Sequence, residues 1–338
     1  MEDVKIAVLI VTFRLFTYRA LTVFCFSGNV MLREILNRIL PQRQRAQFKT
    51  FLPLRRIGNH REYADYMNKI VSEYRLRRDV ERNLILDHNS FVVPGWCFVC
   101  RKEVTFHVDF SYSYFVDGEL MPNWREHLSC PGCGLNNRMR AAIHVFEQEC
   151  VPHQSSRIYI TEQTTPLFQA MLARYPSVIG SEYLAGTSPF GALDAHGIRN
   201  ESITKLTFPN DAFDYILSFD VFEHVPDYTK AFAECFRCLK PDGNLLFTVP
   251  FTGNPDTLVR AQVNADGTIS HLMPPEYHGD PLNTNGCLCF YHFGWDMLEN
   301  VRKLGFRDAV ALIYWSRDFG YLGNSAQVIF TAQKRGQT

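Results

Sequence analysis

Short apolar runs alternate with amphipathic stretches in the second half of the chain. Seven runs have the length and composition of buried strands: RIYIT, SVIGSEY, SITKL, FDYILSF, GNLLFTVPF, DAVALIYWS and AQVIFTAQ. Between several of them lie stretches with apolar residues at helical spacing: TPLFQAMLARY, YTKAFAECFRCLK and GWDMLENVRKLG. This alternation predicts an α/β fold with a seven-stranded, mostly parallel sheet and helices on both faces. The last two strands are joined without a helix, so we expect them to pair antiparallel.

The first part of the chain has a different pattern. Apolar residues recur every three or four positions in MLREILNRIL and YADYMNKIVSEYRLRRDVERNLI, which predicts helices. Segment 1–60 contains ten Lys or Arg residues and three Asp or Glu residues, so this end is basic. Its first apolar stretch is interrupted by Arg14 and Arg19, and the uncharged run 6–13 is too short to span a membrane. The absence of a clear cleavage site disfavours a signal peptide. A buried strand and helix, or contact of the N-terminus with a membrane surface, are the remaining interpretations, and Met31 is an alternative start.

A third pattern lies between these two. From FVVPGWCFVC to LSCPGCGLNN the chain is rich in glycine, proline, aromatic residues and paired cysteines, and VTFHVDFSYSYF between the pairs alternates like short strands. We therefore divide the chain into a basic, mainly helical region at 1–90, a small cysteine-containing ribbon at 91–150 and an α/β domain at 151–338. Residues 252–290 form an insertion in that last domain.

Charge and cysteine content narrow the class of protein. The 338 residues include 35 Lys or Arg and 35 Asp or Glu, so the formal net charge is zero and gives no strong nucleic-acid signal. An RNA-modifying enzyme would depend on a few basic residues near the cysteines, Arg101, Lys102, Arg138 and Arg140. Four of the ten cysteines form one pattern and the others are scattered, which does not indicate secretion. We predict a cytoplasmic protein.

The paired cysteines predict a metal site. Cys97 and Cys100, and then Cys130 and Cys133, form two C-x-x-C pairs beside glycine or proline. Two such pairs complete the tetrahedral shell of one zinc ion and leave no position for water, so the prediction is a structural zinc ribbon. Disulfides or independent thiols are the alternative. A further pair, Cys235 and Cys238, lies in a predicted helix without turn residues and is interpreted as a buried helix face.

The segment LTFPNDAFDYILSFDVFEHVPDYTKAFAECFRCLKPDGNLLFTVPF resembles a known family. It is similar to the fourth strand, the following helix with its LKPDG turn, and the fifth strand of class I S-adenosylmethionine-dependent methyltransferases of the type 11 kind. Residues 157–333 as a whole resemble that family. The resemblance implies a Rossmann-like fold, S-adenosylmethionine as cofactor and transfer of a methyl group.

The same resemblance implies cofactor-binding residues at the strand ends. Glu182 stands where the family binds the ribose hydroxyls, and Glu162 stands at an acidic position of the first strand. The adenine position corresponds to Glu201 or Ser202, and Asp220 and Glu223 follow the fourth strand. Capping of the next helix is the alternative role of Glu223. The family usually has a glycine-rich loop after its first strand, whereas this chain has YITEQTTPLF. That difference favours an alternative, a catalytically inactive binding module that docks a protein partner through its zinc ribbon.

The insertion contains candidates for the acceptor side. In class I methyltransferases this region tends to cover the methyl acceptor, and here YHGDP gathers His278 and Asp280 around a glycine. A histidine has a suitable pKa range for removing a proton from a hydroxyl or amine acceptor. The candidate catalytic residues are therefore His278 as first choice, His224 as second choice, and Asp280. A loop histidine bonded to its own turn is the structural alternative. We expect a small-molecule or glycan acceptor.

Overall fold

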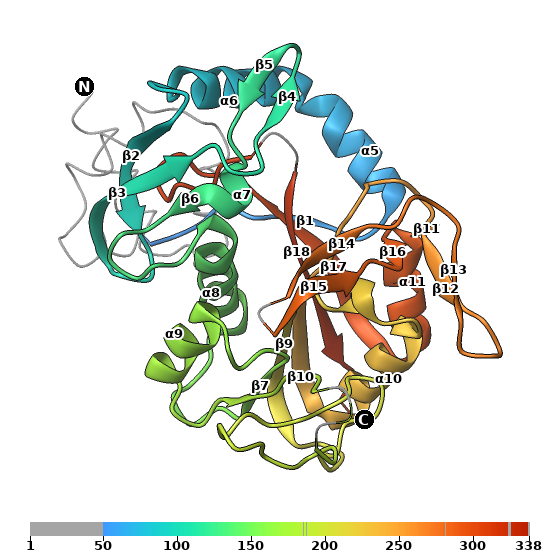
Figure 1. Ribbon diagram of the computed structural model, residues 1–338. Helices are drawn as coiled ribbons and strands as arrows, with labels where there is room; N and C mark the ends of the chain where they lie inside the picture. The colour runs from blue at the N-terminus through green and yellow to red at the C-terminus, as the bar shows by residue number, and fades with distance from the viewer. Residues whose placement is uncertain (1–49, 185, 187, 281, 324–325, 337–338) are drawn as a thin grey trace, which may run out of the picture. The chain divides into compact units, whose positions relative to one another are not determined.

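The structure is a computed structural model that describes residues 50–184, 186, 188–280, 282–323 and 326–336 (Figure 1). Residues Leu52–Thr338 form one compact unit. The apolar N-terminal stretch, its interpretation as a membrane-surface contact, and the helix expected in MLREILNRIL lie outside the described residues.

A seven-stranded sheet forms the centre of this unit, in the order β1-β17-β18-β10-β9-β7-β8. The strands are β1 (Arg55–Ile57), β7 (Ile158–Ile160), β8 (Ile179–Gly180), β9 (Phe213–Phe219), β10 (Leu239–Thr248), β17 (Phe306–Tyr314) and β18 (Gln327–Lys334). Strands β8, β7, β9 and β10 pair in parallel, whereas β18 is antiparallel to both β10 and β17, and β17 is antiparallel to β1. The expected antiparallel pairing of the last two strands is confirmed. Five strands run in one direction, yet three of the six pairings are antiparallel, so the sheet is less parallel than predicted.

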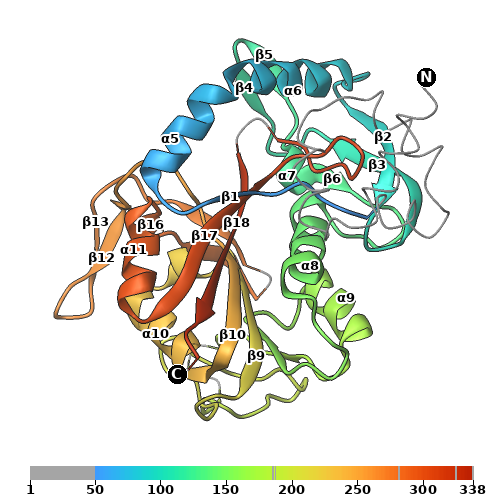
Figure 2. The ribbon, with the colours of Figure 1, turned by 180° about the vertical axis from the view of Figure 1, so that it is seen from behind.

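Two strands differ from the prediction. The run SITKL forms no strand; it contains only the isolated bridge between Ser202 and Lys205. Hydroxyl and carboxylate side chains in this segment bond locally to one another and to the backbone, which competes with a strand ladder. The seventh strand is β1 at the opposite edge (Figure 2), in a region predicted to be helical. Three residues with a single buried side chain, Ile57, carry too short a pattern to be detected.

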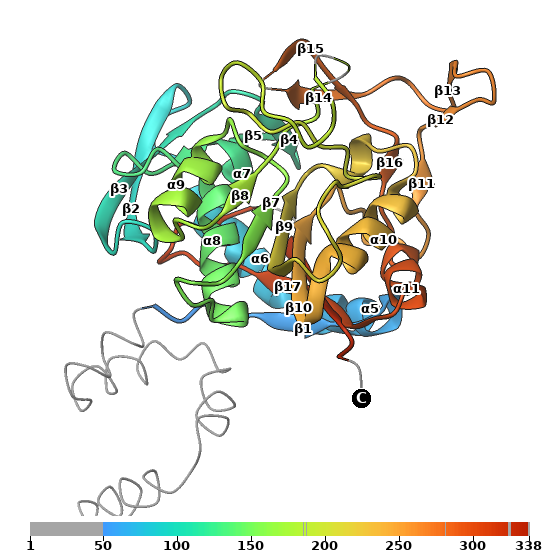
Figure 3. The same ribbon diagram turned by 90° about the horizontal axis from the view of Figure 1, so that it is seen from below.

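Helices cover both faces of the sheet, as predicted. Helices α8 (Asn137–Cys150) and α9 (Pro166–Arg174) lie on one face, and α10 (Tyr228–Cys238) and α11 (Asp296–Lys303) lie on the other (Figures 1 and 3). Side chains of the strands alternate between two cores: Ile158 and Ile160 of β7 pack with α8 and α9, while Tyr159 packs with α10. No helix in the described part of the chain combines the length and apolar character needed to cross a membrane.

The long helix predicted for YADYMNKIVSEYRLRRDVERNLI is divided into α5 (His60–Lys69) and α6 (Val71–Asn83). The division falls at Ile70, whose ψ of 11° departs from helical geometry. Helix α6 is attached to the sheet domain by the buried carboxylate of Glu81, which accepts from the indole of Trp315 and the amide of Gly323, both at 2.7 Å. This helix is therefore part of the same unit as the sheet.

The cysteine-containing region is built from short elements. Strands β2 (Ser90–Cys97), β3 (Lys102–Asp109) and β6 (Leu128–Ser129) form a small antiparallel sheet, and β4 (Tyr114–Val116) pairs with β5 (Glu119–Met121). Helix α7 (Trp124–His127) precedes β6. The side-chain amide of Asn137, at the start of α8, donates to the carbonyls of Trp124 and Leu322. These bonds join the region to the segment between β17 and β18, and its apolar residues share one core with α8 and α9.

The insertion 252–290, expected as a long loop, forms short antiparallel pairs, one of them with the strand that directly follows it. They are β11 (Leu258–Val259) with β16 (Tyr291–His292), β12 (Ala261–Val263) with β13 (Ile269–His271), and β14 (Tyr277–Asp280) with β15 (Asn283–Leu288). The β12–β13 hairpin projects away from the central sheet (Figure 3). A 3₁₀ turn, η1 (Phe222–His224), follows β9 and receives a backbone hydrogen bond from Phe290 at the end of the insertion. This contact brings the insertion to the carboxyl end of β9.

Candidate active site

The loop between β7 and α9 is held by carboxylates rather than by glycines. Oε1 of Glu182, which follows β8, accepts from the amides of Gln163 and Thr164 at 2.7 and 2.8 Å and from the Thr164 hydroxyl at 2.8 Å. Oε2 of Glu182 has no hydrogen-bond partner among the described residues. The hydroxyl of Thr165, the N-cap of α9, donates to Glu162 and accepts from the Phe168 amide. The loop therefore places Glu162 beside Glu182.

Close packing of this loop depends on a glycine in the neighbouring strand. A Cβ added to Gly180 of β8 would lie 2.6 Å from the carbonyl oxygen of Glu162 and 2.6 Å from the ring of Phe168. Such distances are well inside van der Waals contact. The loop can therefore pack tightly against β8 because residue 180 has no side chain.

Glu162 interacts electrostatically with the other acidic residues at this edge. Burial raises the pKa of Glu162 to about 7; the Thr165 hydroxyl and Arg138 act in the opposite direction, and the charges of Glu182 and Asp220 add to the rise. The three carboxylates follow β7, β8 and β9, which are adjacent in the sheet. They are therefore close enough to influence one another's protonation.

Asp220 ends β9 and is ion-paired. Its φ of 53° turns the chain sharply, and its amide remains bonded to the carbonyl of Thr248 at 3.0 Å. Arg125 donates to both carboxylate oxygens, at 3.0 and 2.9 Å, and the Thr248 hydroxyl donates to Oδ1 at 2.8 Å. Nε of Arg138 lies 3.3 Å from Oδ2. Burial alone would raise the pKa of Asp220, but the two guanidinium groups outweigh it and hold this pKa below its usual value.

We call Arg125, Glu126 and Arg138 the arginine cluster. Arg125 and Glu126 belong to α7 and Arg138 belongs to α8, so they flank the second cysteine pair in sequence. Glu126 bonds both arginines and the side-chain amide of Asn136. With Asp220 the cluster has two positive and two negative charges, so it is balanced. We did not predict Arg125 or Glu126, because a charged residue on a short helix gives no local signal of a partner 95 positions away.

The two residues assigned to the adenine position lie beside Glu182 but are occupied locally. The amide of Glu201 donates to the carbonyl of Glu182 at 2.9 Å. The Glu201 carboxylate accepts from Arg199 at 2.8 Å and from the amide and hydroxyl of Thr207 at 2.9 and 2.5 Å. The Ser202 hydroxyl is 3.0 Å from that of Thr204. In this structure both residues stabilise the turn at 200–207.

We call Glu223, His224 and His278 the histidine cluster. Glu223 and His224 come from η1, directly after Asp220, and His278 comes from β14 of the insertion. The two imidazole ring centres are 4.9 Å apart. Oε1 of Glu223 is 3.6 Å from Nε2 of His224 and 3.5 Å from Nδ1 of His278. The structure thus brings together His224, His278 and Glu223, three residues proposed from sequence.

Hydrogen bonds outside the histidine cluster orient its two imidazoles. Nδ1 of His224 lies 2.8 Å from the carbonyl of Leu288, and Nε2 of His278 lies 3.0 Å from Oε1 of Glu276. A carbonyl and an ionised carboxylate only accept, so these outer nitrogens carry the protons. The thiol of Cys289, followed by Glu223, raises the pKa of His278 to about 11, so this imidazole is cationic at neutral pH in this arrangement.

Glu276 was not predicted as a site residue. Its Oε1 accepts from both His278 and His292 at 3.0 Å, and its Oε2 is paired with Arg260 at 3.0 Å. Burial alone would raise the pKa of Glu276, but these donors outweigh it and lower this pKa. Both oxygens of Glu276 have partners, and Oε1 orients the two histidines.

Asp280 lies at the far end of β14 from the histidine cluster. Its Oδ1 accepts from the amide of Leu282 at 2.8 Å, and its Oδ2 accepts from the thiol of Cys287 at 3.2 Å. An open hollow of about 280 Å³ is lined by the β14–β15 hairpin, residues 277–280 and 283–286. His278 and Asp280 both line it, so the hollow shares His278 with the histidine cluster.

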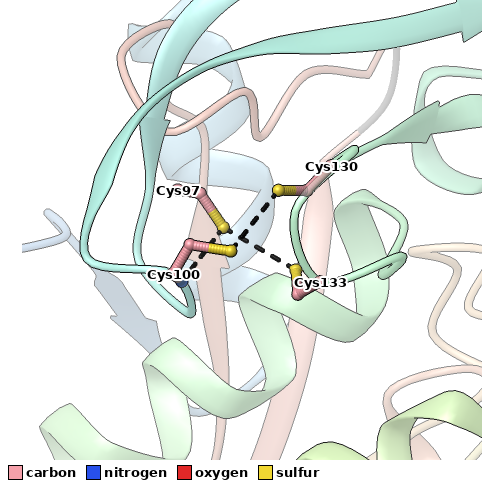
Figure 4. Close-up of side chains that lie close together, drawn as sticks. All are labelled: Cys97, Cys100, Cys130 and Cys133. Carbon is pink, nitrogen blue, oxygen red and sulfur yellow. Dashed lines mark hydrogen bonds between the residues drawn. The ribbon is translucent and has the colours of Figure 1, made fainter.

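We call Cys97, Cys100, Cys130 and Cys133 the cysteine cluster, and Figure 4 shows their sulfur atoms converging. The Sγ atoms of Cys97 and Cys133 are 3.8 Å apart, those of Cys100 and Cys130 are 3.7 Å apart, and all four lie within 4.8 Å of one another. Four sulfurs at about 2.3 Å from one ion would be separated by about 3.8 Å. The hydrogen bond from Cys133 is the main reason that the pKa of Cys97 falls to about 5. The geometry fits a tetrahedral metal ion.

Arg140 supports the cysteine cluster from α8. Its guanidinium is fully buried, donates to the carbonyls of Phe319 and Gly320, and lies 4.0 Å over the ring of Phe106. Its charge also interacts with three of the four cysteines. A buried cation beside several thiolates reduces their mutual repulsion. Cys235 and Cys238 are both buried in α10, as predicted for a helix face.

Residues 168–247 match the family model described as a methyltransferase domain. The matched segment runs from α9 to β10 and includes Glu182 and Asp220. A probable S-adenosylmethionine-dependent methyltransferase from Mycolicibacterium smegmatis is 36% identical over 53 residues, which are 16% of this chain and 21% of that protein. Phosphoethanolamine N-methyltransferase 2 from Caenorhabditis elegans is 40% identical over 42 residues, 12% of this chain and 10% of that protein. The chain spans only about a fifth and a tenth of the length of these relatives.

Solved structures of methyltransferases also align with the chain. A Burkholderia thailandensis 1,6-didemethyltoxoflavin-N1-methyltransferase, crystallised with 1,6-didemethyltoxoflavin and S-adenosylhomocysteine, is 15% identical with a TM-score of 0.35. That alignment covers 58% of this chain and 78% of the other. An S-adenosylmethionine-dependent methyltransferase from Mesorhizobium loti is 16% identical with a TM-score of 0.33, over 57% of this chain and 98% of the other.

Proposed function

We propose that this protein is an S-adenosylmethionine-dependent methyltransferase that acts on a small-molecule or glycan acceptor. The observation that carries the proposal is that Glu162, Glu182 and Asp220 follow three adjacent parallel strands, two of them within the segment matching the methyltransferase-domain model. Ligands of open α/β sheets bind beyond the carboxyl ends of the strands. A cytoplasmic location is part of the same prediction.

The chemistry of the side chains at this edge fits the cofactor. S-adenosylmethionine has ribose hydroxyls that donate hydrogen bonds, an ammonium and a sulfonium that are cationic, and one carboxylate. Oε2 of Glu182 is an available acceptor, and Glu162 and Asp220 contribute negative charge. Arg125 and Arg138 supply cationic donors for a carboxylate. Each charged group of the cofactor therefore has a complementary group on this chain.

We assign roles along the edge on this basis. Glu182 accepts from the ribose hydroxyls, Glu201 and Ser202 lie on the adenine side, and Glu162 and Asp220 lie toward the amino-acid part. Glu223, which the family resemblance assigns to the cofactor, faces the two histidines, so we assign it to the acceptor side. Bound S-adenosylmethionine supplies the methyl group, and alignment of donor and acceptor can contribute roughly 7 to 11 kcal/mol to the rate.

On the acceptor side we propose that His224, His278 and Asp280 contact the methyl acceptor. His278 and Asp280 line the hollow of about 280 Å³, which suits a small molecule or a sugar unit more than a folded protein. The hollow and the histidine cluster share His278. An acceptor bound there would lie beside the carboxyl end of β9.

We further propose that the cysteine cluster binds one structural zinc ion. The sulfur separations of 3.7 and 3.8 Å match a tetrahedral shell, and four thiolates leave no position for a substrate. Since the second cysteine pair lies between Arg125 and Arg138, the ion would also fix the arginine cluster at Asp220.

Calorimetric titration with S-adenosylmethionine tests the proposal. Wild-type protein should bind saturably, and Glu182→Gln should bind about 10 to 100 times more weakly, because Gln still accepts from the loop amides but loses a charged acceptor. Asp242→Asn, a change at an exposed carboxylate of β10 in the same segment, should bind as wild type. A folded wild-type chain without affinity at millimolar cofactor would refute the proposal and favour the inactive binding module. Mass spectrometry of co-purified ligands would then identify an acceptor.

A further inference from the structure

Glu223 is a buried carboxylate with an unusual lack of donors in the described part of the chain. Its side chain is fully buried, and neither Oε1 nor Oε2 has a hydrogen-bond partner among the described residues. Burying a carboxylate without hydrogen-bond donors is costly. Buried polar atoms are nearly always bonded, so an exception needs an explanation, and a bound ion is one.

Each of the two imidazoles has one ring nitrogen facing this carboxylate. Nε2 of His224 and Nδ1 of His278 are 3.6 and 3.5 Å from Oε1 of Glu223, too long for good hydrogen bonds. The three potential ligand atoms lie within 4.8 Å of one another. Ligand atoms at about 2.0 to 2.1 Å from a tetrahedral ion are about 3.3 Å apart. A small inward movement of the three side chains would therefore allow them to coordinate one ion.

The outer nitrogens are held as they are in metal sites. His224 donates its other N–H to the carbonyl of Leu288, and His278 donates its other N–H to Glu276. Metal-binding histidines almost always make such a bond to a carbonyl or carboxylate, which fixes the ring and selects the free nitrogen. In both histidines the nitrogen that is not used in this bond faces Glu223, and His278 would release the proton on that nitrogen when an ion binds.

We propose that Glu223, His224 and His278 bind a divalent transition-metal ion. Two imidazoles and one carboxylate form the ligand set of open zinc and iron sites, in which further positions remain for a substrate. His278 also lines the hollow in which we place the acceptor. The metal binding stands by itself, whereas its use, to hold a hydroxyl or carboxylate oxygen of the acceptor beside the methyl donor, rests on the proposed function.

A neighbouring group lacks these features. Glu276, Cys289 and His292 also lie within 4.8 Å of one another. However, both oxygens of Glu276 are bonded, Arg260 balances its charge, and the thiol of Cys289 lies 3.3 Å from the carbonyl of Tyr291. Unlike Glu223, the carboxylate of this group has partners for both oxygens, so we assign no ion to it.

The competing explanation is that the charge of Glu223 is balanced by a proton on His278 and not by a metal ion. In that case the cationic His278 alone balances Glu223, and added metal ions find no site. The two explanations differ in a measurement that needs neither S-adenosylmethionine nor an acceptor, so its failure would leave the proposed function untouched.

The experiment titrates full-length, tag-free protein, whose cysteine cluster is first filled with Zn²⁺, with Co²⁺ and records visible absorption and calorimetric heat. Wild type should bind one Co²⁺ per chain. Glu223→Gln should bind at least about tenfold more weakly, and Asp266→Asn, an exposed carboxylate of the β12–β13 hairpin, should bind as wild type. His278→Gln provides a second test if Glu223→Gln fails to give the wild-type circular dichroism. Absence of saturable binding in wild type, or wild-type affinity in both cluster variants, would overturn the metal site.

Discussion

The segment 220–224 is bounded by two very different clusters. On one side Asp220 meets the arginine cluster, which flanks the second cysteine pair and in which charges balance and oxygens are bonded. On the other side Glu223 meets two histidines at distances beyond normal hydrogen bonds, and its oxygens have no donor among the described residues. A saturated network stabilises one arrangement, whereas an unsaturated one retains the capacity to bind something. The comparison teaches that a ligand at Asp220 would share groups that already have partners, whereas a ligand at Glu223 would meet a carboxylate with no hydrogen-bond donor among the described residues.

The largest expected effect comes from removing one ligand of the cysteine cluster. Cys97→Ser should abolish zinc binding and lower the free energy of unfolding by more than about 3 kcal/mol, because binding of a structural ion is part of the folding free energy. Urea denaturation and metal analysis by mass spectrometry measure both. Cys150→Ser, outside the cysteine cluster, should keep the zinc and cost about 1 kcal/mol or less. Equal effects of the two changes would remove the distinction on which the structural assignment depends.

A smaller effect concerns the ion pair between the cysteine-containing region and β9. The double-mutant cycle of Arg125→Gln and Asp220→Asn should give a coupling energy of about 1 to 2 kcal/mol, reduced by solvent because the Arg125 side chain is 36% exposed. Thermal and urea unfolding of the four proteins provide the values. Simple additivity of the two changes would mean that the pair is an exposed contact without energetic importance.

The pH dependence of stability tests the acidic edge. The pKa of Glu162 is raised from 4.5 to about 7, so the folded state binds more protons than the unfolded state between these values. Stability from this group is present below about pH 4.5 and is lost as the pH rises through 7, by an amount on the order of 1 to 3 kcal/mol. Glu162→Gln should flatten this slope in urea denaturation series from pH 4.5 to 7.5. Asp220 has the opposite sign, because its lowered pKa gives stability that disappears at acid pH. An unchanged slope in Glu162→Gln would show that Glu162 is not buried as described.

The smallest effect separates the histidine cluster from its neighbour. His292→Gln removes one donor to Glu276, which keeps His278 and Arg260, so stability should change by about 0.5 kcal/mol. Affinity for Co²⁺ should change less than about threefold, since His292 does not face Glu223. A loss of Co²⁺ affinity as large as that in His278→Gln would indicate that the ion binds at Glu276 and not at Glu223.

Strand β9 and the cysteine cluster could be predicted from sequence because their signals are local. The run FDYILSF coincides with β9, since its mainly apolar residues lie between Asp211 on one side and Asp220 on the other. The four cysteines are recognisable in the sequence because they form two C-x-x-C pairs. In contrast, β12 and β13 are three residues each and largely exposed, so their pairing is set by the hairpin rather than by burial.

The partners of the site residues could not be predicted, because they depend on the tertiary fold. Asp220 and Arg125 are 95 positions apart, and His278 meets Glu223 only because the insertion folds back on η1. An isolated arginine or glutamate on a short element is most often a solvated residue. The candidates at the strand ends were recognised through a family resemblance, whereas the residues that surround them emerged from the packing.

Gly180 has a consequence for how this edge tolerates change. Many replacements in the segment TEQTT should be harmless to its backbone path, provided that the amides still reach Glu182, whereas even one methyl group at position 180 would collide with a carbonyl and an aromatic ring. Grafting a glycine-rich turn from a methyltransferase into this chain would therefore loosen a connection that is already tight, and the decisive position for redesign is in the adjacent strand.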